Sequence, residues 1–210
     1  MRTTAKPGRP VADPARDLRR ALLITSRTLL DTDGPSALSM REVARRTGCT
    51  HQAPYHYFED RESILATLVA EGFDDLAVRL QAANAIAAVE GPRAALLASG
   101  QAYVGFALEH PGVFRIMFRP DLCDASRFPA VQDAGTRARE ELDVLNRILH
   151  TRDADAASAT MLWSHVHGLA GLLIDGPLSA PLAMPAEQQA HVTEVLARFA
   201  DLMLGATPYR

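Results

Sequence analysis

Side chains that could read the edges of DNA bases stand close together near residue 50. The amide of Gln52 can pair bidentately with adenine, and the methyl group of Ala53 could contact the methyl group of thymine. Such contacts need a rigid element that carries these residues into a groove. The surrounding residues 39–58 predict that element, because they read as two short helices joined by a tight turn.

The first helix of this pair is predicted to begin at Ser39. With Glu42 three residues later, Ser39 predicts a capping box, in which each side chain bonds the backbone N–H of the other residue. One buried stripe follows at helical spacing, and Gly48 supplies the positive φ that ends the helix. The stripe consists of Met40, Val43, Ala44 and Thr47.

The second helix is predicted to be short, roughly two turns long and ending near Phe58. Thr50 can cap its start. Pro54 is tolerated only near the first turn, where few N–H groups have a partner within the helix.

From Leu18 to Phe73 the chain resembles the N-terminal domain of the TetR-type repressors. The hallmark of that domain is a helix-turn-helix that closes on a Tyr-x-(His/Tyr)-Phe run, here residues 55–58, followed by a basic residue, here Arg61. The family more often has Lys at that position, and an apolar residue other than Pro at position 54.

This resemblance implies roles for individual residues. His56 could face either way, and Phe58 is interpreted as an apolar plug. The expected phosphate contacts are Ser39, Arg41, Tyr55, Tyr57 and Arg61. The residues expected to face the floor of the groove are Thr50, His51, Gln52 and Ala53.

Charge is distributed unevenly along the chain. Residues 1–62 contain 11 Lys and Arg against 8 Asp and Glu, whereas residues 63–210 contain 11 against 17. A basic head on an acidic body favours DNA binding by the head, although the whole chain has a net charge of −3. We expect a basic disordered arm over 1–12, a helix-turn-helix DNA-binding domain over 13–62, and a ligand-binding and dimerisation domain over 63–210.

The N-terminal cations could reach phosphates beside the groove, and a solvated arm is an equally good interpretation. These cations are Arg2, Lys6, Arg9, Arg16, Arg19 and Arg20.

The spacing of apolar residues predicts an all-α fold of about nine helices. No useful window shows the period-two alternation that indicates a strand. Besides the helix pair, we expect a bracing helix over 13–33 and a long helix from Asp60 through Leu80, which would link head and body. Further helices are expected at about 92–107, 113–118, 129–150, 153–174 and 185–205.

Residues 163–168 carry the pattern Trp-x-x-x-His-Gly. With residues 110–118 upstream, they resemble the C-terminal domain of TetR-family members that share a Trp-His-Gly signature. The resemblance implies a homodimer in which the last two helices of each subunit form a four-helix bundle. Small residues would let these helices approach closely, although they could also pack within one subunit. The expected interface is Gly168, Gly171, Val192, Val195, Leu196 and Phe199.

The body also holds more aromatic and polar-tipped side chains than simple packing needs, which favours a ligand pocket over a solid core. Tyr103, Phe106 and His110 lie near one face of a helix, and Trp163 and His167 share a face of another. A solid core in which Tyr103 and His167 bond their neighbours is the alternative. The expected ligand contacts are Phe73, Leu76, Tyr103, Phe106, His110, Phe114, Met117, Phe118, Trp163 and His167.

The sequence offers no familiar catalytic or metal-binding pattern, so no cofactor and no metal are predicted. His165 and His167 point to different sides of a helix, and Cys49 and Cys123 are interpreted as separate reduced thiols. The longest apolar run, residues 169–174, is too short to span a membrane, and we expect a cytoplasmic protein.

These observations predict a sequence-specific DNA-binding transcriptional regulator and not an enzyme. The most favoured form is a homodimeric repressor that a small, mostly apolar ligand releases from a palindromic operator. Two other classes stay open. A small all-helical enzyme would need a convergent set of catalytic groups. An architectural DNA-binding protein would bind DNA without a ligand switch.

Overall fold

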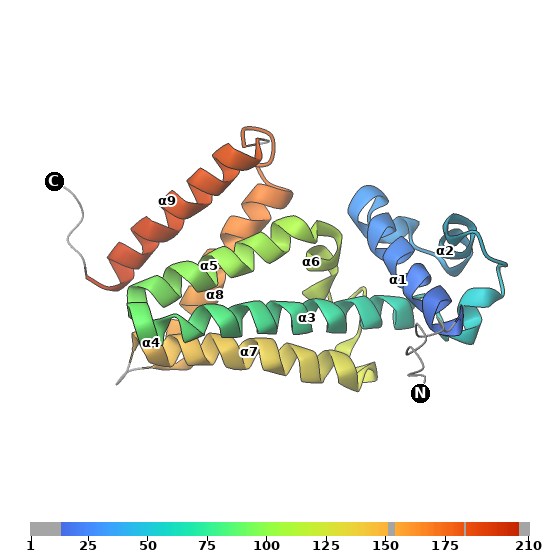
Figure 1. Cartoon of the computed structure of the whole chain (residues 1–210), viewed down its shortest axis with the longest axis horizontal. Coiled ribbons are helices and arrows are strands. Elements are labelled where there is room, and N and C mark those ends of the chain that lie inside the picture. The colour runs from blue at the N-terminus through green and yellow to red at the C-terminus, as the bar shows by residue number, and fades with distance from the viewer. Residues whose placement is uncertain (1–13, 151–153, 183, 206–210) are drawn as a thin grey trace, which may run out of the picture. The chain divides into compact units, whose positions relative to one another are not determined.

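The computed structural model describes residues 14–150, 154–182 and 184–205 (Figure 1). Over these residues it contains nine α-helical segments, three 3-10 turns and no strand, so the predicted all-α fold is confirmed. The arm expected over residues 1–12 lies outside the described residues. The chain divides between Ile64 and Leu65 into two compact units.

The first unit is a small helical head. Its elements are α1 (Pro14–Asp33), η1 (Pro35–Ala37), α2 (Met40–Thr47), η2 (Ala53–His56) and the first turn of α3 (Arg61–Ala85). The apolar stripe predicted for α2 packs against α1: Met40, Val43 and Ala44 are buried, and the Thr47 hydroxyl donates to the hydroxyl of Thr25 at 3.0 Å.

The ends of α2 follow the predicted signals, with one correction. The Ser39 hydroxyl accepts from the backbone N–H of Glu42 at 3.2 Å, and Gly48 ends the helix at a φ of 76°. The reciprocal bond of a capping box is not made by Glu42. Its carboxylate is bonded instead to the guanidinium groups of Arg45 and Arg46, because charged donors one turn along the helix compete better than a neutral N–H.

The second unit continues α3 and adds seven described elements. They are α4 (Ala87–Glu90), α5 (Pro92–Glu109), α6 (Pro111–Met117), η3 (Ala125–Arg127), α7 (Pro129–Leu149), α8 (Ala156–Ile174) and α9 (Pro185–Met203). The single turn α4 was not predicted. Helix α8 begins three residues later than expected, because Asp155 caps it by accepting from the Ser158 N–H at 2.7 Å.

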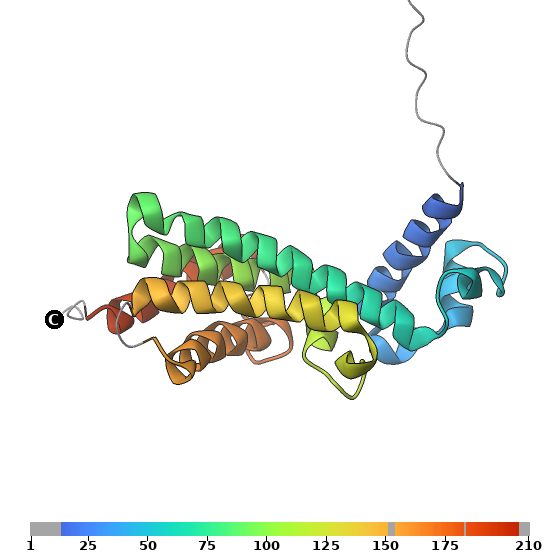
Figure 2. The same cartoon turned by 90° about the horizontal axis from the view of Figure 1, so that it is seen from below.

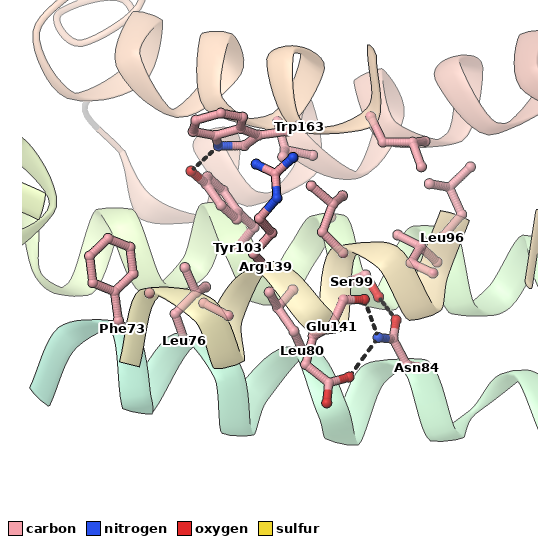
Figure 3. Close-up of a pocket in the computed structure, with 17 residues that line it drawn as sticks. Phe73, Leu76, Leu80, Asn84, Leu96, Ser99, Tyr103, Arg139, Glu141 and Trp163 are labelled. Carbon is pink, nitrogen blue, oxygen red and sulfur yellow. Dashed lines mark hydrogen bonds between the residues drawn. The ribbon is translucent and has the colours of Figure 1, made fainter. Parts of the chain in front are cut away.

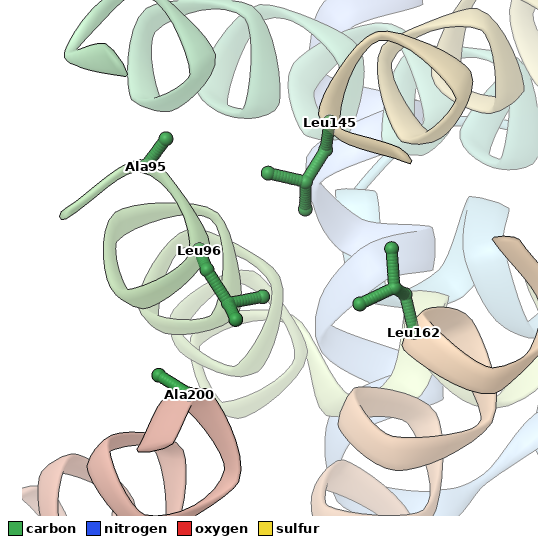
Figure 4. Close-up of a cluster of buried hydrophobic side chains, with 5 residues drawn as sticks. All are labelled: Ala95, Leu96, Leu145, Leu162 and Ala200. Atoms are coloured by element: carbon green, nitrogen blue, oxygen red, sulfur yellow. The ribbon is translucent and has the colours of Figure 1, made fainter. Parts of the chain in front are cut away.

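Helix α5 is the centre of this unit. Its residues are apolar on nearly every side, which is the pattern of a helix surrounded by others. It contacts α7, α8 and α9, and Figure 2 shows α3 and α7 running side by side along the same unit. One core cluster joins α5 to α7, α8 and α9 through Ala95, Leu96, Leu145, Leu162 and Ala200 (Figure 4).

Two helices of this unit approach closely at Gly100. A Cβ atom at this position would lie only 2.7 Å from Cδ2 of Leu196, so α9 can approach α5 here because residue 100 has no side chain. Among the described residues, no helix is both long and apolar enough to cross a membrane.

Candidate DNA interface and ligand pocket

The segment after Gly48 is a tight turn and not the predicted two-turn α-helix. Pro54 has no N–H and cannot bond the carbonyl of Thr50 in the α-helical pattern. That carbonyl accepts from the Ala53 N–H at 3.0 Å instead, and the Gln52 carbonyl accepts from the Tyr55 N–H at 3.1 Å. The result is the 3-10 turn η2. Residues three apart eclipse in such a turn, which brings Gln52 and Tyr55 to one side.

Exposure separates the residues of this segment into two groups. Pro54 and Phe58 are buried, and Ala53 and Tyr57 are half-buried. The Arg19 guanidinium covers the Phe58 ring, with 5.4 Å between Cζ and the ring centroid. The exposed side chains among those expected to contact DNA are Ser39, Arg41, Thr50, His51, Gln52 and Tyr55, and His56 is exposed as well.

Three of these exposed residues surround one hollow in the surface. Arg41 comes from α2, and His51 and Tyr55 come from the turn that follows it. The Gln52 amide nitrogen lies 3.2 Å from Nε2 of His51, within hydrogen-bond distance. The hollow therefore offers a cation, an imidazole and a phenol to a ligand at the surface.

Arg41 differs from the other two arginines of α2. Arg45 and Arg46 are both bonded to Glu42, and Arg46 also pairs with Asp33. The hydrogen bond from Arg45 and then that from Arg46 lower the pKa of Glu42 to about 2. These two guanidinium groups are engaged within the head, whereas the Arg41 side chain is exposed beside the hollow.

Arg61, which we expected to contact phosphate, is hydrogen-bonded within the head. Its Nε donates to the Leu38 carbonyl at 2.8 Å, and its Nη2 donates to the Pro35 carbonyl at 2.7 Å. The side chain is half-buried and ties the start of α3 to the loop before α2. Asp60 caps α3 as predicted, because its carboxylate accepts from the Ser63 N–H at 2.7 Å.

The second unit holds a cavity of about 190 Å³ between α3, α5, α7 and α8 (Figure 3). Its walls are largely apolar. They are formed by Phe73, Leu76, Leu80, Asn84, Leu96, Ser99, Gly100, Tyr103, Gly135, Ala138, Arg139, Glu141, Leu142, Leu145, Leu162, Trp163 and Val166.

Four of the expected ligand contacts line this cavity: Phe73, Leu76, Tyr103 and Trp163. The other six do not. Phe114, Phe118 and His167 pack behind Tyr103 and Trp163 as an aromatic cluster, with ring centroids 4.8 to 5.8 Å apart for the contacts of Phe118 with Phe114, Trp163 and His167.

The remaining three expected contacts face α3. Met117 packs on Gly72, where a Cβ atom would lie 3.0 Å from its sulfur. The Arg79 guanidinium covers the Phe106 ring, with 5.7 Å between Cζ and the ring centroid. Nε2 of His110 lies 3.6 Å from the Asp75 carboxylate. The cavity follows the face of α5 that runs from Leu96 to Tyr103, which is nearer the start of that helix than we expected.

The polar groups of the pocket form two bonded chains. At one end, the Ser99 hydroxyl donates to Oδ1 of Asn84 at 2.8 Å, and the Asn84 amide donates to the Glu141 carboxylate at 3.0 Å. At the other end, Tyr103 links Trp163 and His167. Burial raises the pKa of Tyr103 and lowers the pKa of His167, so both groups stay neutral near neutral pH.

Sequence reasoning missed the wall that α7 contributes. Gly135, Ala138, Leu142 and Leu145 recur at helical spacing, which is also the pattern of an ordinary core-facing stripe. Only the placement of α7 beside α3 shows that this stripe lines a pocket and does not pack in a solid core.

Two of the residues expected at a dimer interface belong to the core of a single chain. Val192 and Leu196 are each 2% exposed and pack with Val104, Leu169 and Leu173. They are corrected from interface to core, because the apolar face of α9 packs on α5 and α8 of its own chain. Val195 and Phe199 are half-buried. Gly168 is exposed, Gly171 is half-buried, and a Cβ atom at either position would meet nothing within 4 Å.

Two models of one protein family match the chain. Residues 22–68 match bacterial regulatory proteins of the tetR family, and residues 96–199 match the tetracyclin repressor-like C-terminal domain. The chain belongs to the TetR family. The model that matches the N-terminal residues is one of bacterial regulatory proteins, which agrees with the predicted class of function.

Individual relatives are more distant. Over 92 residues the TetR-family chain is 28% identical to the HTH-type transcriptional regulator Rv1816 of Mycobacterium tuberculosis, a match that spans 44% of this chain and 39% of the relative. The chain thus spans about two fifths of the length of the curated relatives it matches.

Solved structures resemble the TetR-family chain over most of its length. A protein of unknown function from Rhodococcus sp. RHA1 is 28% identical, with a TM-score of 0.69 over 91% of this chain and 96% of that one. The TetR-family transcriptional regulator PfmR from Thermus thermophilus has a TM-score of 0.67 over 90% of this chain and 99% of that one. At 22% identity, PfmR supports the fold alone.

Proposed function

We propose that this regulator binds a specific palindromic operator as a homodimer, acts as a repressor, and leaves the DNA when a small, mostly apolar molecule enters the pocket of the second unit. The observation that carries the DNA-binding part is the exposed set His51, Gln52 and Tyr55, which follows a capped helix that presents the exposed cation Arg41.

Base reading is assigned to the turn. Gln52 is exposed, and its amide can offer the donor and acceptor pair that adenine presents in the major groove. His51 and Thr50 stand beside it, and the methyl group of Ala53 is partly accessible. Phosphate contacts are assigned to Arg41, Ser39 and Tyr55, all of which are exposed, and to the hydroxyl of the half-buried Tyr57.

The dimer is assigned to the outer faces of α8 and α9. Met161, Gly168 and Leu172 follow one another along α8 and are exposed, and Leu202 of α9 is 71% exposed. His165, which lies between Met161 and Gly168 on α8, is half-buried, and its ring stacks on that of Phe199 with 3.7 Å between the ring centroids. Its Nε2 is buried without a hydrogen-bond partner among the described residues. An apolar stripe with small residues suits close packing against a second copy.

Release of DNA is assigned to α3. This helix starts at Arg61, which holds the loop before α2, and its later residues Phe73, Leu76 and Leu80 line the pocket. A ligand that favours one position of these later residues would bias the position of the helix start. To convert a mostly bound population to a mostly free one, the ligand must favour the released state by about 5 kcal/mol.

Selection from random duplexes tests the DNA-binding part. We expect enrichment of a near-palindrome with half-sites about one helical turn apart. The Gln52→Ala variant should lose roughly 1 to 3 kcal/mol at one base pair and accept other bases there. A selection that enriches no palindromic site would refute the proposal.

Light scattering tests the dimer. A Cβ atom at Gly168 would meet nothing within 4 Å, so we expect Gly168→Leu to leave the monomer folded and to weaken only the association. Gly105→Leu on α5 is the matched control, because a Cβ atom there also meets nothing within 4 Å. A wild-type protein that is monomeric at micromolar concentration would exclude this interface.

A further inference from the structure

Arg139 is the pocket residue whose chemistry the proposed function leaves unused. It lies on α7 and is exposed, so it stands where the pocket meets solvent. In Figure 3 its guanidinium reaches from α7 toward Trp163 on α8. Within the described part of the chain this guanidinium makes no hydrogen bond or ion pair, although Asp143 lies one turn further along the same helix.

The other polar groups of the pocket already bond one another. Asn84 joins Ser99 to Glu141, and Tyr103 joins Trp163 to His167. Glu141 could attract a cationic ligand, but its carboxylate already accepts from the buried amide of Asn84 at 3.0 Å. Arg139 is therefore the pocket residue whose N–H donors are not already bonded to another group of the pocket. Two N–H groups of a guanidinium can donate side by side to the two oxygens of a carboxylate.

The size of the cavity limits the apolar part of such a ligand. An apolar cavity of about 150 Å³ holds benzene. The present cavity of about 190 Å³ is slightly larger and has walls of Leu, Phe and Ala side chains. It can take one aromatic ring or a short alkyl chain, whose burial would supply most of the affinity.

We propose that the effector of this pocket is a small amphipathic anion, an alkyl or aryl carboxylate whose apolar part fills the cavity and whose carboxylate binds Arg139. The inference rests on the proposed function, because it takes this pocket to be the ligand site, and it adds the chemical class of the ligand.

Trp163 provides a direct measurement, because it is the only tryptophan of the chain and it lines the pocket. Titration of the full chain without DNA would use octanoate, 1-octanol and octylamine, which share one chain length and differ in head group. We expect octanoate to bind about fivefold more tightly than 1-octanol, the effect of an ion pair worth about 1 kcal/mol at an exposed site. Octylamine should bind most weakly.

Arg139→Gln should reverse the order of octanoate and 1-octanol. The carboxylate would lose its partner, whereas the alcohol would keep the same apolar burial and so report that the pocket is still folded. Arg147→Gln is the matched control, since Arg147 is an exposed arginine of α7 that does not line the pocket. This variant should preserve the wild-type order.

Three results would overturn the inference: equal affinities of the wild type for octanoate and 1-octanol, tightest binding of octylamine, or no binding of any of the three. Because the titration contains no DNA, it is independent of the proposed function. If octanoate is preferred through Arg139 but the protein selects no duplex, the proposed function fails and the inference stands. If a duplex is selected but octanoate is not preferred, the inference alone fails.

Discussion

The indole N–H of Trp163 donates a hydrogen bond to the phenol oxygen of Tyr103 at 3.1 Å, and the same oxygen lies 2.9 Å from Nδ1 of His167. Trp163 can only donate, and burial lowers the pKa of His167 and favours its neutral form. In the His167 tautomer that is protonated at Nε2, the Tyr103 hydroxyl accepts from Trp163 and donates its own proton to Nδ1. One hydroxyl on α5 thus bonds two side chains of α8 at the end of the pocket.

Tyr103→Phe removes that hydroxyl and leaves the Trp163 N–H and His167 Nδ1 without their shared partner. We expect a loss of about 1 to 3 kcal/mol in the free energy of unfolding, measured by urea denaturation. The emission of Trp163 should shift as well. Tyr55→Phe is the control, since Tyr55 is 54% exposed and should cost little. An unchanged urea midpoint for Tyr103→Phe would contradict this account.

Gly100→Ala should destabilise the second unit. The added Cβ would lie 2.7 Å from Cδ2 of Leu196. Because Leu196 is buried, its side chain can shift only by disturbing the packing of α9 on α5, at a cost of about 1 to 3 kcal/mol. Gly105→Ala, on the same helix but with nothing within 4 Å of its Cβ, should stabilise by about 0.5 to 1 kcal/mol. Thermal unfolding of the two variants would measure this difference. A change in melting temperature of the same sign for both variants would contradict the close packing of Gly100 on Leu196.

Arg61→Ala and Arg41→Ala should weaken DNA binding in different ways. Arg61 holds the carbonyls of Leu38 and Pro35, so its loss should lower the stability of the head and leave the salt dependence of binding unchanged. Arg41 is exposed, and its loss should reduce the slope of log K against log salt by about one unit. Binding measured at several salt concentrations separates them. A reduced slope for Arg61→Ala would restore it as a phosphate contact.

Stability should fall as the pH drops below about 6.5, the usual pKa of histidine. Burial lowers the pKa values of His165 and His167 in the folded chain. Well above pH 6.5 these two imidazoles are neutral in the folded and in the unfolded chain, so they do not change the free energy of unfolding with pH. As the pH falls through that value, the unfolded chain takes up protons that the folded chain resists, which favours unfolding.

Urea midpoints at pH 7.5, 6.5 and 5.5 would measure this dependence. His165→Phe keeps a ring against Phe199 and removes one titrating group, so it should flatten the profile. A wild-type midpoint that is constant over this range would disagree with the burial of these imidazoles.

The sequence predicted helix ends where a local signal sets them. Asp60 caps α3, Gly48 ends α2, and prolines open α5, α7 and α9. Each of these signals acts on backbone groups within one turn, so it can be recognised without knowledge of the tertiary structure. The effect of Pro54 was also local but was misjudged, because the missing N–H changes the hydrogen-bond pattern of the whole turn.

The pocket could be predicted only in part. Tyr103 and Trp163 were recognisable because their polar tips exceed what packing needs. Leu142 and Ala138 are ordinary core residues by type, and the same holds for Val192 and Leu196, which were expected at an interface. Whether an apolar side chain faces a cavity, a core or a partner depends on which helices lie opposite it.

The 3-10 turn at Pro54 has a consequence for how much of a genome this regulator can distinguish. One turn presents few side chains, so each copy would read only a few base pairs directly. Each mismatched base pair costs about 1 to 3 kcal/mol. A half-site of so few base pairs therefore gives only a modest difference in affinity between the operator and other genomic sequences. In the proposed dimer, most of the specificity for one promoter would then come from the spacing of the two half-sites and from the ease with which the DNA between them deforms.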